Sequence, residues 1–568
     1  MARPFEIHDG VLEKYIREDG VTEVVVPEGV TKIESRAFAY CRELTAVILP
    51  ESLQEIGMMA FDECSGLTMV RFPRHLDRLW PYAFQFCSQL TSVTLPDGLQ
   101  ALEDGTFKGC RHLTDVTLPD GLRHIGKEAF YGCGALRRIA IPETVQRICA
   151  HAFHGCESLA DVTLPATAPT IMEDVFLDTP WITAGEGPFR IIGDLLLRYT
   201  GTDAEVTVPP CVTRIAGSAF ERCTAVTAVT LRAYVTEIGP RAFFQCTALE
   251  EITLPGALET IGSGAFRECA HLTAVRLPSV VLRIGESAFQ GCTALREITI
   301  PHSVRETGRS LFSGCTALTS ARLSRRMTAV VPSMFAHCTS LTQVEIPEGP
   351  QTVGATAFAG CTSLRTIRLP TSVREIGHGA FMGCDSLTDI DLSPDIETIW
   401  GSAFAQCRSL TSIGLPDHLR EMHDAFPECP RLREVTHRGR TYALPALLHT
   451  IPPEARDAVF RMILGHPWDD RYPMSTLAPA FAVLLLMGMD DPALLAAVQK
   501  HRVKLLRWLL KTDDAADLRV LLDRLPFTRR DLYNGVYAAS EAGAKACYIL
   551  LLNEIREGGE LAKKDRRL

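Results

Sequence analysis

The sequence predicts an α/β repeat solenoid followed by an all-α C-terminal domain. Cysteine recurs every 23 residues, first from Cys41 to Cys156 and again from Cys223 to Cys407. Apolar residues between the cysteines follow an L-x-x-L-x-L spacing, as in the segment 249–254. A period of about 20–29 residues with this spacing is typical of solenoids whose stacked units share one core.

Each repeat is predicted to contain two short strands and one tight turn. Apolar and polar residues alternate in segments such as 298–300, which indicates a strand with one buried face. Pro301 lacks the N–H that a sheet needs, so it ends that strand. A second apolar pair, as in Val373 and Ile376, indicates another extended rung. The Ala-Phe-x-x-Cys segment indicates a short helical or 3₁₀ turn.

Stacking in register places identical side chains in columns and produces a superhelix of short parallel strands. A column of phenylalanines runs from Phe220 to Phe404 and is expected to close with Phe426. The residue before each phenylalanine is nearly always alanine, because a larger side chain would crowd the turn. Leu311 and Met334 are exceptions, so we predict locally looser packing at those rungs.

The chain contains its starting cap twice. Residues 5–15 alternate around Asp9-Gly10 and predict a β-hairpin that covers the end of the first rung. Residues 189–199 repeat this order, so we predict a second hairpin and a junction against which Trp181 packs. The predicted segments are an N-terminal hairpin cap and first rung (1–35), a first array (36–180), an internal hairpin cap or junction (181–217), a second array (218–438), a helical domain (439–557) and a flexible tail (558–568).

Beyond Tyr442 the pattern becomes helical. Residues 494–510 carry apolar side chains at i, i+3 and i+4, with Lys and Arg on the other face. Asp513-Asp514 and Thr528 are predicted to cap the two helices that follow. Residues 536–552 predict a further helical pair.

The composition of the chain argues against some classes of function. The 568 residues are 46% hydrophobic and 22% charged, with a formal net charge of −10. Since clustered Lys and Arg are missing, we expect no nucleic-acid partner. The first ten residues show no secretory signal, and no apolar run is long enough to span a membrane. We therefore predict a cytoplasmic protein without membrane insertion.

The cysteines predict buried thiols. All but three of the nineteen (Cys149, Cys211 and Cys547) occupy one slot of the repeat, which suits a column of small inward side chains. Neighbouring rungs are close enough for disulfides, yet one inward column rarely offers the required dihedral angle. Stacked disulfides and metal ligation are the alternatives. Buried thiols favour a reducing compartment.

The repeat resembles the BspA-like leucine-rich repeat family of bacteria, over roughly residues 5–437. The shared unit is Cys-x-x-Leu-x-x-Ile-x-Leu-Pro…Ile-Gly-x-x-Ala-Phe. The helical tail resembles degenerate ankyrin repeats through Ala538-Ala539, Gly543 and residues 550–552. The resemblance implies a leucine-rich repeat superhelix without catalytic activity. Members of the family are typically surface or secreted proteins that bind host proteins or other bacteria.

Motifs for catalysis are missing from the sequence. It contains no G-x-x-x-x-G-K-[ST], H-E-x-x-H or G-x-S-x-G pattern. The cysteines are columnar and the histidines scattered, so no pair forms a nucleophile and its base. We predict no enzyme, no catalytic residue, no cofactor and no metal site. His437, His449 and His466 flank the junction of array and helices, where we expect solvated or capping histidines, and Cys547 is expected in a helix core.

The candidate binding surface is the outward-facing side of the strands. Successive rungs of the second array place one polar residue between the two apolar positions of each strand, and a neighbouring column adds more. Solenoids present such residues on a long concave face. The competing interpretation is a ladder of charges paired across strands. The candidate residues, called the strip below, are Arg276, Thr299, Arg322, Glu345, Arg368, Asp391, Glu251, Glu297, Gln343 and Asp389.

Three functions remain as hypotheses. The first is a non-catalytic protein–protein interaction scaffold, monomeric, with a protein partner of unknown identity on the concave face. The alternative is an exported or surface-displayed adhesin that binds host or bacterial proteins and reaches the cell surface by a non-standard route. The remote alternative is an enzyme with its site at the junction of the leucine-rich repeats and the helices. The helical tail either caps the array or docks a second partner.

Overall fold

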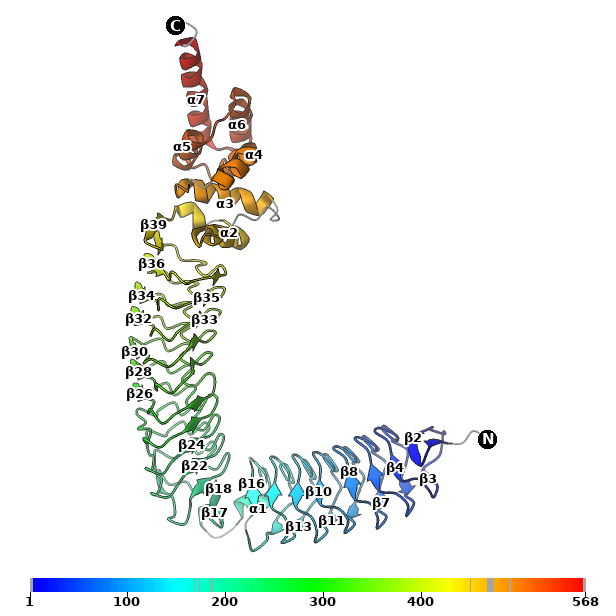
Figure 1. Cartoon of the computed structure of the whole chain (residues 1–568). Helices are drawn as coiled ribbons and strands as arrows, with labels where there is room; N and C mark the ends of the chain where they lie inside the picture. The colour runs from blue at the N-terminus through cyan, green and yellow to red at the C-terminus, as the bar shows by residue number, and fades with distance from the viewer. Residues whose placement is uncertain are drawn as a thin grey trace. The chain divides into compact units, whose positions relative to one another are not determined.

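The computed structural model describes residues 4–167, 169–172, 174–184, 187–449, 451–466, 474–489 and 492–564. They divide into two units, Met1–Phe289 and Gln290–Leu568, which are described separately, and Figure 1 shows the course of the chain with the element labels used below. Both units contain stacked repeats of parallel strands, and helices follow the repeats in the second unit. The predicted solenoid and helical tail are confirmed.

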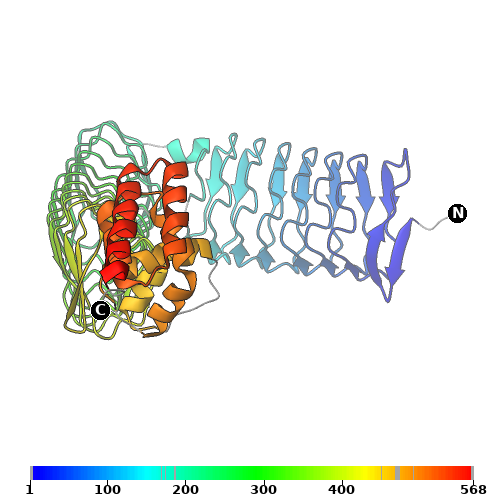
Figure 2. The same cartoon turned by 90° about the horizontal axis from the view of Figure 1, so that it is seen from above.

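The repeats of the first unit build two rows of parallel strands (Figure 2). Strands in each row pair without offset, so that Val47 lies beside Val70 and Ile33 beside Ile56. The three-residue row contains β3 (Glu23–Val25), β5 (Ala46–Ile48), β7 (Met69–Arg71), β9 (Ser92–Thr94), β11 (Asp115–Thr117), β13 (Arg138–Ala140) and β15 (Asp161–Thr163). The two-residue row contains β4 (Lys32–Ile33), β6 (Glu55–Ile56), β8 (Arg78–Leu79), β10 (Ala101–Leu102), β12 (His124–Ile125), β14 (Arg147–Ile148) and β16 (Thr170–Ile171). Each repeat therefore supplies one strand to each row.

The two predicted hairpins are present and nearly identical. They are β1 (Phe5–His8) with β2 (Val11–Tyr15), and β17 (Phe189–Ile192) with β18 (Leu195–Tyr199). Each has its register shift after the second residue of its first strand, and β2 and β18 continue in parallel into β4 and β20. The tyrosine that ends each hairpin stacks on the first phenylalanine of the column that follows, at 5.2 Å in the first hairpin and 5.1 Å in the second.

The remaining elements of the first unit follow the same plan. A short helix precedes the second hairpin, and both strand rows then resume. These elements are α1 (Pro180–Thr183), β19 (Glu205–Thr207), β20 (Arg214–Ile215), β21 (Ala228–Thr230), β22 (Glu237–Ile238), β23 (Glu251–Thr253), β24 (Thr260–Ile261) and β25 (Arg283–Ile284). Trp181 of α1 packs its ring 4.6 Å from that of Phe176 and lies under the guanidinium of Arg190, so the packing predicted for this tryptophan is confirmed.

The second unit continues both rows and then changes to helices. Its three- to four-residue strands are β26 (Glu297–Thr299), β28 (Ser320–Arg322), β30 (Gln343–Glu345), β32 (Thr366–Arg368), β34 (Asp389–Asp391), β36 (Ser412–Leu415), β38 (Glu434–His437) and the antiparallel β39 (Arg440–Ala443). Its two-residue strands are β27 (Glu306–Thr307), β29 (Ala329–Val330), β31 (Thr352–Val353), β33 (Glu375–Ile376), β35 (Thr398–Ile399) and β37 (Glu421–Met422). The helices are η1 (Ala446–His449), α2 (Pro453–Ile463), α3 (Met474–Leu486), α4 (Pro492–Leu509), α5 (Ala515–Arg524), α6 (Arg529–Ala542) and α7 (Lys545–Lys564).

The predicted helix caps are present. Asp514 accepts hydrogen bonds from the first turn of α5, and Thr528 forms a capping box with Asp531 at the start of α6. Gly543 ends α6 in the left-handed conformation. Helix α7 continues to Lys564, beyond residue 558 where we expected a flexible tail, and residues 565–568 lie outside the described residues.

The phenylalanine column forms the core, as predicted. Adjacent rings stack nearly parallel within each unit, and their centroids are mostly 4.8–5.4 Å apart. The spacing widens to 5.7 and 5.6 Å around Phe107 and to 5.6 and 5.5 Å around Phe335. Thr106 and Met334 stand before these two phenylalanines in place of alanine. The rings are thus farther apart beside the larger residue, as the looser packing expected at Met334 predicts, while the hydrogen bond from the N–H of Phe335 to the next rung keeps its length of 2.8 Å.

The Ala-Phe-x-x-Cys segments form tight turns without a regular helix. The N–H of Cys269 donates to the carbonyl of Phe266, three residues earlier, as in a 3₁₀ turn. The N–H of Phe266, however, donates at 2.7 Å to the carbonyl of Ala288 in the next rung. The turn is thus interrupted by hydrogen bonds that join successive rungs.

The cysteine column consists of thiols, as predicted. None of the nineteen cysteines, all of which lie in described segments, forms a disulfide. Within each array the column thiols donate to a phenylalanine carbonyl in the preceding rung, as the Sγ of Cys361 does at 3.2 Å to Phe335, whereas Cys41 and Cys223 at the array starts contact the carbonyls of Ala39 and Tyr199. Burial raises the pKa of Cys361 to about 12, so this thiol keeps its proton.

Candidate functional site

The strip residues point outward from the strands, as their spacing predicts. In β32 the side chain of Ile367 is buried, whereas Thr366 and Arg368 on either side are exposed. The same alternation exposes all ten strip residues. Glu251 and Arg276 belong to the first unit and the other eight to the second.

Two ion pairs cross between neighbouring strands of the strip. Arg322 lies opposite Glu345 in the register of β28 and β30, with an N–O distance of 3.1 Å. Arg368 lies opposite Asp391 in the register of β32 and β34, also at 3.1 Å. The side chain of Arg368 is 87% exposed. An exposed pair of this kind contributes about 0–1 kcal/mol, so it breaks at little cost when another charge approaches.

Arg276 differs from the other strip residues. Its segment, residues 272–278, is not part of a strand, although Val275 is buried and Arg276 is exposed. Buried and exposed side chains therefore still alternate in this segment, although it forms no strand of the sheet. Sequence reasoning predicted the side-chain direction here, but not the loss of the strand.

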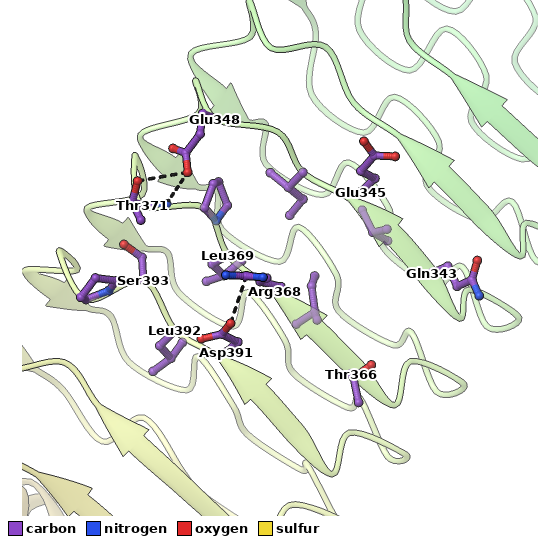
Figure 3. A pocket seen from close by; sticks show the side chains of 15 residues that line it. Gln343, Glu345, Glu348, Thr366, Arg368, Leu369, Thr371, Asp391, Leu392 and Ser393 are labelled. Atoms are coloured by element: carbon purple, nitrogen blue, oxygen red, sulfur yellow. Dashed lines mark hydrogen bonds and ion pairs between the residues drawn. The ribbon is translucent and has the colours of Figure 1, made fainter.

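A groove of about 610 Å³ lies along three successive rungs of the second unit (Figure 3). Its polar lining includes four strip residues, Gln343, Glu345, Arg368 and Asp391. Apolar atoms of Leu369 and of the strand-ending prolines complete its wall. The groove therefore has three acidic side chains, Glu348 included, and one basic side chain beside a narrow apolar surface.

Glu348 belongs to this groove, although the sequence analysis did not single it out. Its carboxylate accepts hydrogen bonds from the N–H and the hydroxyl of Thr371, both at 3.0 Å (Figure 3), and from the N–H of Ser372 at 2.9 Å. These hydrogen bonds, that from the N–H of Thr371 first, lower the pKa of Glu348. An acidic residue directly after the strand-ending proline is the available sequence signal, since Glu143 similarly accepts from the N–H 23 residues later.

Helix α2 covers the last rung of the array. Phe460 packs on Phe426 at 5.4 Å and so extends the phenylalanine column by one ring. Arg456 forms a bidentate ion pair with Asp424, with N–O distances of 2.9 and 3.0 Å, and donates to the carbonyl of Ile451. Of the two roles considered for the helical tail, capping the array is the one that these contacts show.

The three histidines at the junction have separate structural surroundings. His437 is only 2% exposed, because it occupies the inward position held by Leu415 in the preceding strand. It is therefore not the solvated histidine that we expected. Rings of His449 and His466 contact the carbonyl oxygens of Leu432 and Arg420. Burial lowers the pKa of both His437 and His449.

The rows of parallel strands, the phenylalanine column and the paired hairpin caps define a leucine-rich repeat solenoid. The family described as BspA type leucine rich repeat region (6 copies) matches residues 14–133, 81–188, 213–341 and 328–445. The chain belongs to this family. Leucine-rich repeat proteins generally mediate protein–protein interactions.

Several solved structures share the repeat. A leucine-rich repeat protein from Bacteroides ovatus is 27% identical, with 73% of this chain and 93% of that chain covered and a TM-score of 0.35. A leucine rich cell surface protein from Faecalibacterium prausnitzii is 26% identical, with 59% and 89% covered and a TM-score of 0.35. A leucine-rich repeat protein from T. pallidum is 30% identical, with 32% and 90% covered and a TM-score of 0.29. Comparison with curated proteins gives no match. Among the described residues, no helix combines the length and apolar character that crossing a membrane requires.

Proposed function

We propose that the chain is a non-catalytic scaffold that binds a protein partner along the strip of the second unit. The observation that carries this proposal is the groove beside Arg368, where strip residues from three rungs share one continuous surface. Its mixed charges suit a protein segment that presents both signs. Because its ion pairs are exposed, they can exchange partners on binding with little loss of stability.

The partner is proposed to contact the arginines of the strip most closely. Arginine is enriched among the residues that dominate interface energetics, since it combines a planar donor group with a long apolar stem. Arg368 is the most exposed member of the two crossed pairs. The proposed binding surface is therefore the part of the strip between Gln343 and Asp391.

An affinity capture with matched variants tests this proposal. We expect a partner retained from native lysate by the unaltered chain to be lost with Arg368→Ala, and also with the exchange Arg368→Asp plus Asp391→Arg. The exchange keeps an ion pair of the same type in the ladder but reverses its direction. Arg408→Ala is the control, because Arg408 makes a comparable exposed pair with Asp385 away from the groove. Equal retention by all variants contradicts the proposal.

We also propose that the chain works in a reducing compartment. The column thiols support this, because a thiol donates to the phenylalanine carbonyl only while it is reduced and protonated. Cell fractionation tests the location. Removal of the protein from intact cells by external protease favours the adhesin alternative, and full protection until lysis favours the intracellular scaffold.

A further inference from the structure

The N-terminal end of the first array has one covered row of strands and one open row. Hairpin β1–β2 continues the two-residue row beyond β4. The three-residue row ends with β3, whose single strand partner among the described residues is β5 (Figure 2). One backbone edge of β3 therefore lacks a neighbouring strand.

The hydrogen-bond pattern of a parallel sheet determines which backbone groups of β3 point to its open edge. Thr22 accepts hydrogen bonds from the N–H groups of Thr45 and Ala46, and the N–H of Val26 donates to the carbonyl of Ile48. Alternate residues of a strand turn their backbone to opposite sides. The N–H and C=O groups of Glu23 and Val25 consequently face the open edge. An extended peptide binds to such an edge by adding one more strand.

The hairpin edge is protected, whereas β3 is not. Strand β1 carries a register shift between Glu6 and Ile7, which is a common protection against unwanted pairing. Strand β3 pairs with β5 in regular register through all three residues. Of these two edge strands, β3 is the better template for an added strand.

The outer side chains beside β3 are apolar, in contrast to the polar strip of the second unit. Val25, Ile48 and Met69 are 61%, 56% and 60% exposed. Val25 lies directly opposite Ile48, whereas Met69 lies opposite Ala46 and Arg71 lies opposite Ile48, so the apolar patch is direct over two rungs and reaches the third only diagonally. Exposed apolar patches of this kind mark interaction sites. An added strand with apolar residues at alternate positions would cover the Val25 end of the patch.

In the cavity beside the edge, acidic side chains outnumber basic ones by three to two. Glu18, Asp19, Glu23 and Glu43 form no ion pair within the described residues, whereas the nearby Arg42 is paired with Glu63. Glu18, Asp19 and Glu43 also line a cavity of about 280 Å³, together with Arg17, Arg42 and the exposed ring of Tyr40. Carboxylates beside an aromatic face attract a lysine or arginine side chain.

We propose that β3 binds an extended, basic segment of a partner protein by strand addition. The segment supplies backbone hydrogen bonds to Glu23 and Val25, apolar side chains to the patch, and a basic side chain to the cavity beside Tyr40. This surface belongs to the first unit and is separate from the strip of the second unit. A single chain therefore carries two recognition surfaces of different chemistry.

A synthetic strand tests the proposal with the full chain. The probe is the peptide acetyl-Lys-Thr-Val-Lys-Val-Thr-Lys-amide with a fluorescent label, and its binding is followed by anisotropy. We expect binding that weakens with added salt and is lost when every lysine is replaced by glutamate. Methylation of alternate peptide nitrogens is also expected to abolish binding, because it removes the donors of the added strand.

The matched variants are Val25→Pro and Thr207→Pro. Thr207 occupies the position of Val25 in β19, the first strand of the equivalent row after the second hairpin. Proline at residue 25 removes one edge donor, so we expect at least about tenfold weaker peptide binding, and no change for the variant at residue 207. Equal binding by both variants and the unaltered chain overturns the proposal.

Hydrogen exchange of the unaltered chain gives a second test that needs no variant. Unlabelled peptide at saturation should slow exchange of the Glu23 and Val25 amides at least about tenfold. Unchanged exchange at these amides overturns the proposal. Protection that depends on protein concentration without peptide also overturns it, because the occupant would then be a second copy of the chain.

Discussion

The N-terminal and C-terminal ends of the repeats present the same problem, since each exposes a phenylalanine ring and two strand edges. At the N-terminus, Phe5 and Tyr15 cover Phe38, and the hairpin covers only the two-residue row. At the C-terminus, Phe460 covers Phe426, helix α2 lies against β37, and β39 covers β38.

The difference between the ends lies in how firmly each is closed. The C-terminal closure includes the buried ion pair between Arg456 and Asp424, whereas the N-terminal closure relies on aromatic contacts of a half-buried Phe5. In a repeat array each rung is stabilised mainly by its contacts with adjacent rungs, so the contacts that close an end determine the stability of the rungs nearest to that end. The end that leaves β3 open also exposes the apolar side chains of Val25, Ile48 and Met69.

The largest expected effect is that of Arg456→Ala. The side chain of Arg456 is 10% exposed and that of Asp424 is 22% exposed, so the substitution leaves a largely buried carboxylate without its partner. We expect the last rung to lose about 3 kcal/mol, measured as the free energy of local opening by native-state hydrogen exchange. Arg408→Ala removes an exposed pair and should cost less than about 1 kcal/mol. Similar losses for the two variants would show that α2 does not seal the array.

The two end-covering rings give the next largest difference. Phe460→Ala removes a ring that is 1% exposed and should cost about 3 kcal/mol at the C-terminal rungs. Phe5→Ala removes a partly exposed ring and should cost about 1–2 kcal/mol at the N-terminal rungs. The reverse order would contradict the stronger closure at the C-terminus.

The C-terminal end is also expected to weaken in acid. Burial lowers the pKa of His437 below its ordinary value of 6.5, so the unfolded chain binds a proton before the folded chain does. The stability that depends on neutral His437 is complete above about pH 7 and decreases as the pH falls through about 6. His437→Leu restores the side chain found at the equivalent position in the preceding rung and should flatten this dependence, which thermal unfolding at several pH values measures. An unchanged slope would contradict the assignment of this pH dependence to His437.

The smallest expected effect is that of Arg368→Ala on stability. Its side chain is 87% exposed, so the free energy of unfolding should change by less than about 0.5 kcal/mol. Denaturant titration measures this change. A larger loss would mean that the paired charges stabilise the array. The alternating charges of the strip would then be explained by folding and not by partner binding.

The periodic part of the fold was predictable because one local rule repeats many times. The spacing of Ile298, Pro301 and the equivalent residues predicted both strand rows, and the order from Phe189 to Tyr199 predicted the second hairpin. The rung-to-rung hydrogen bond of Phe266 was not predictable, since it depends on the exact rise between rungs. The sealing pair of Arg456 and Asp424 joins a helix to a turn outside the repeat, where no periodicity guides the prediction.

The candidate site was predictable only in part. Alternation predicted that Arg322, Glu345, Arg368 and Asp391 share an outward face, and the alternating signs predicted the ion pairs now seen. The groove depends on side-chain lengths and on the backbone path after each proline, so the role of Glu348 was missed. The open edge of β3 depends on which row the hairpin joins, and the sequence did not reveal that choice.

Residue-resolved hydrogen exchange of the full chain tests the stacked-rung architecture most directly. Within each array the column phenylalanines donate their N–H to a carbonyl of the next rung, as Phe38 does to Ala60 and Phe358 to Ala380. We predict strong protection of these amides along the repeats of each unit, with fast exchange at Glu23 and Val25. Fast exchange at the phenylalanine amides, with protection confined to the helices, would contradict a solenoid held together rung by rung.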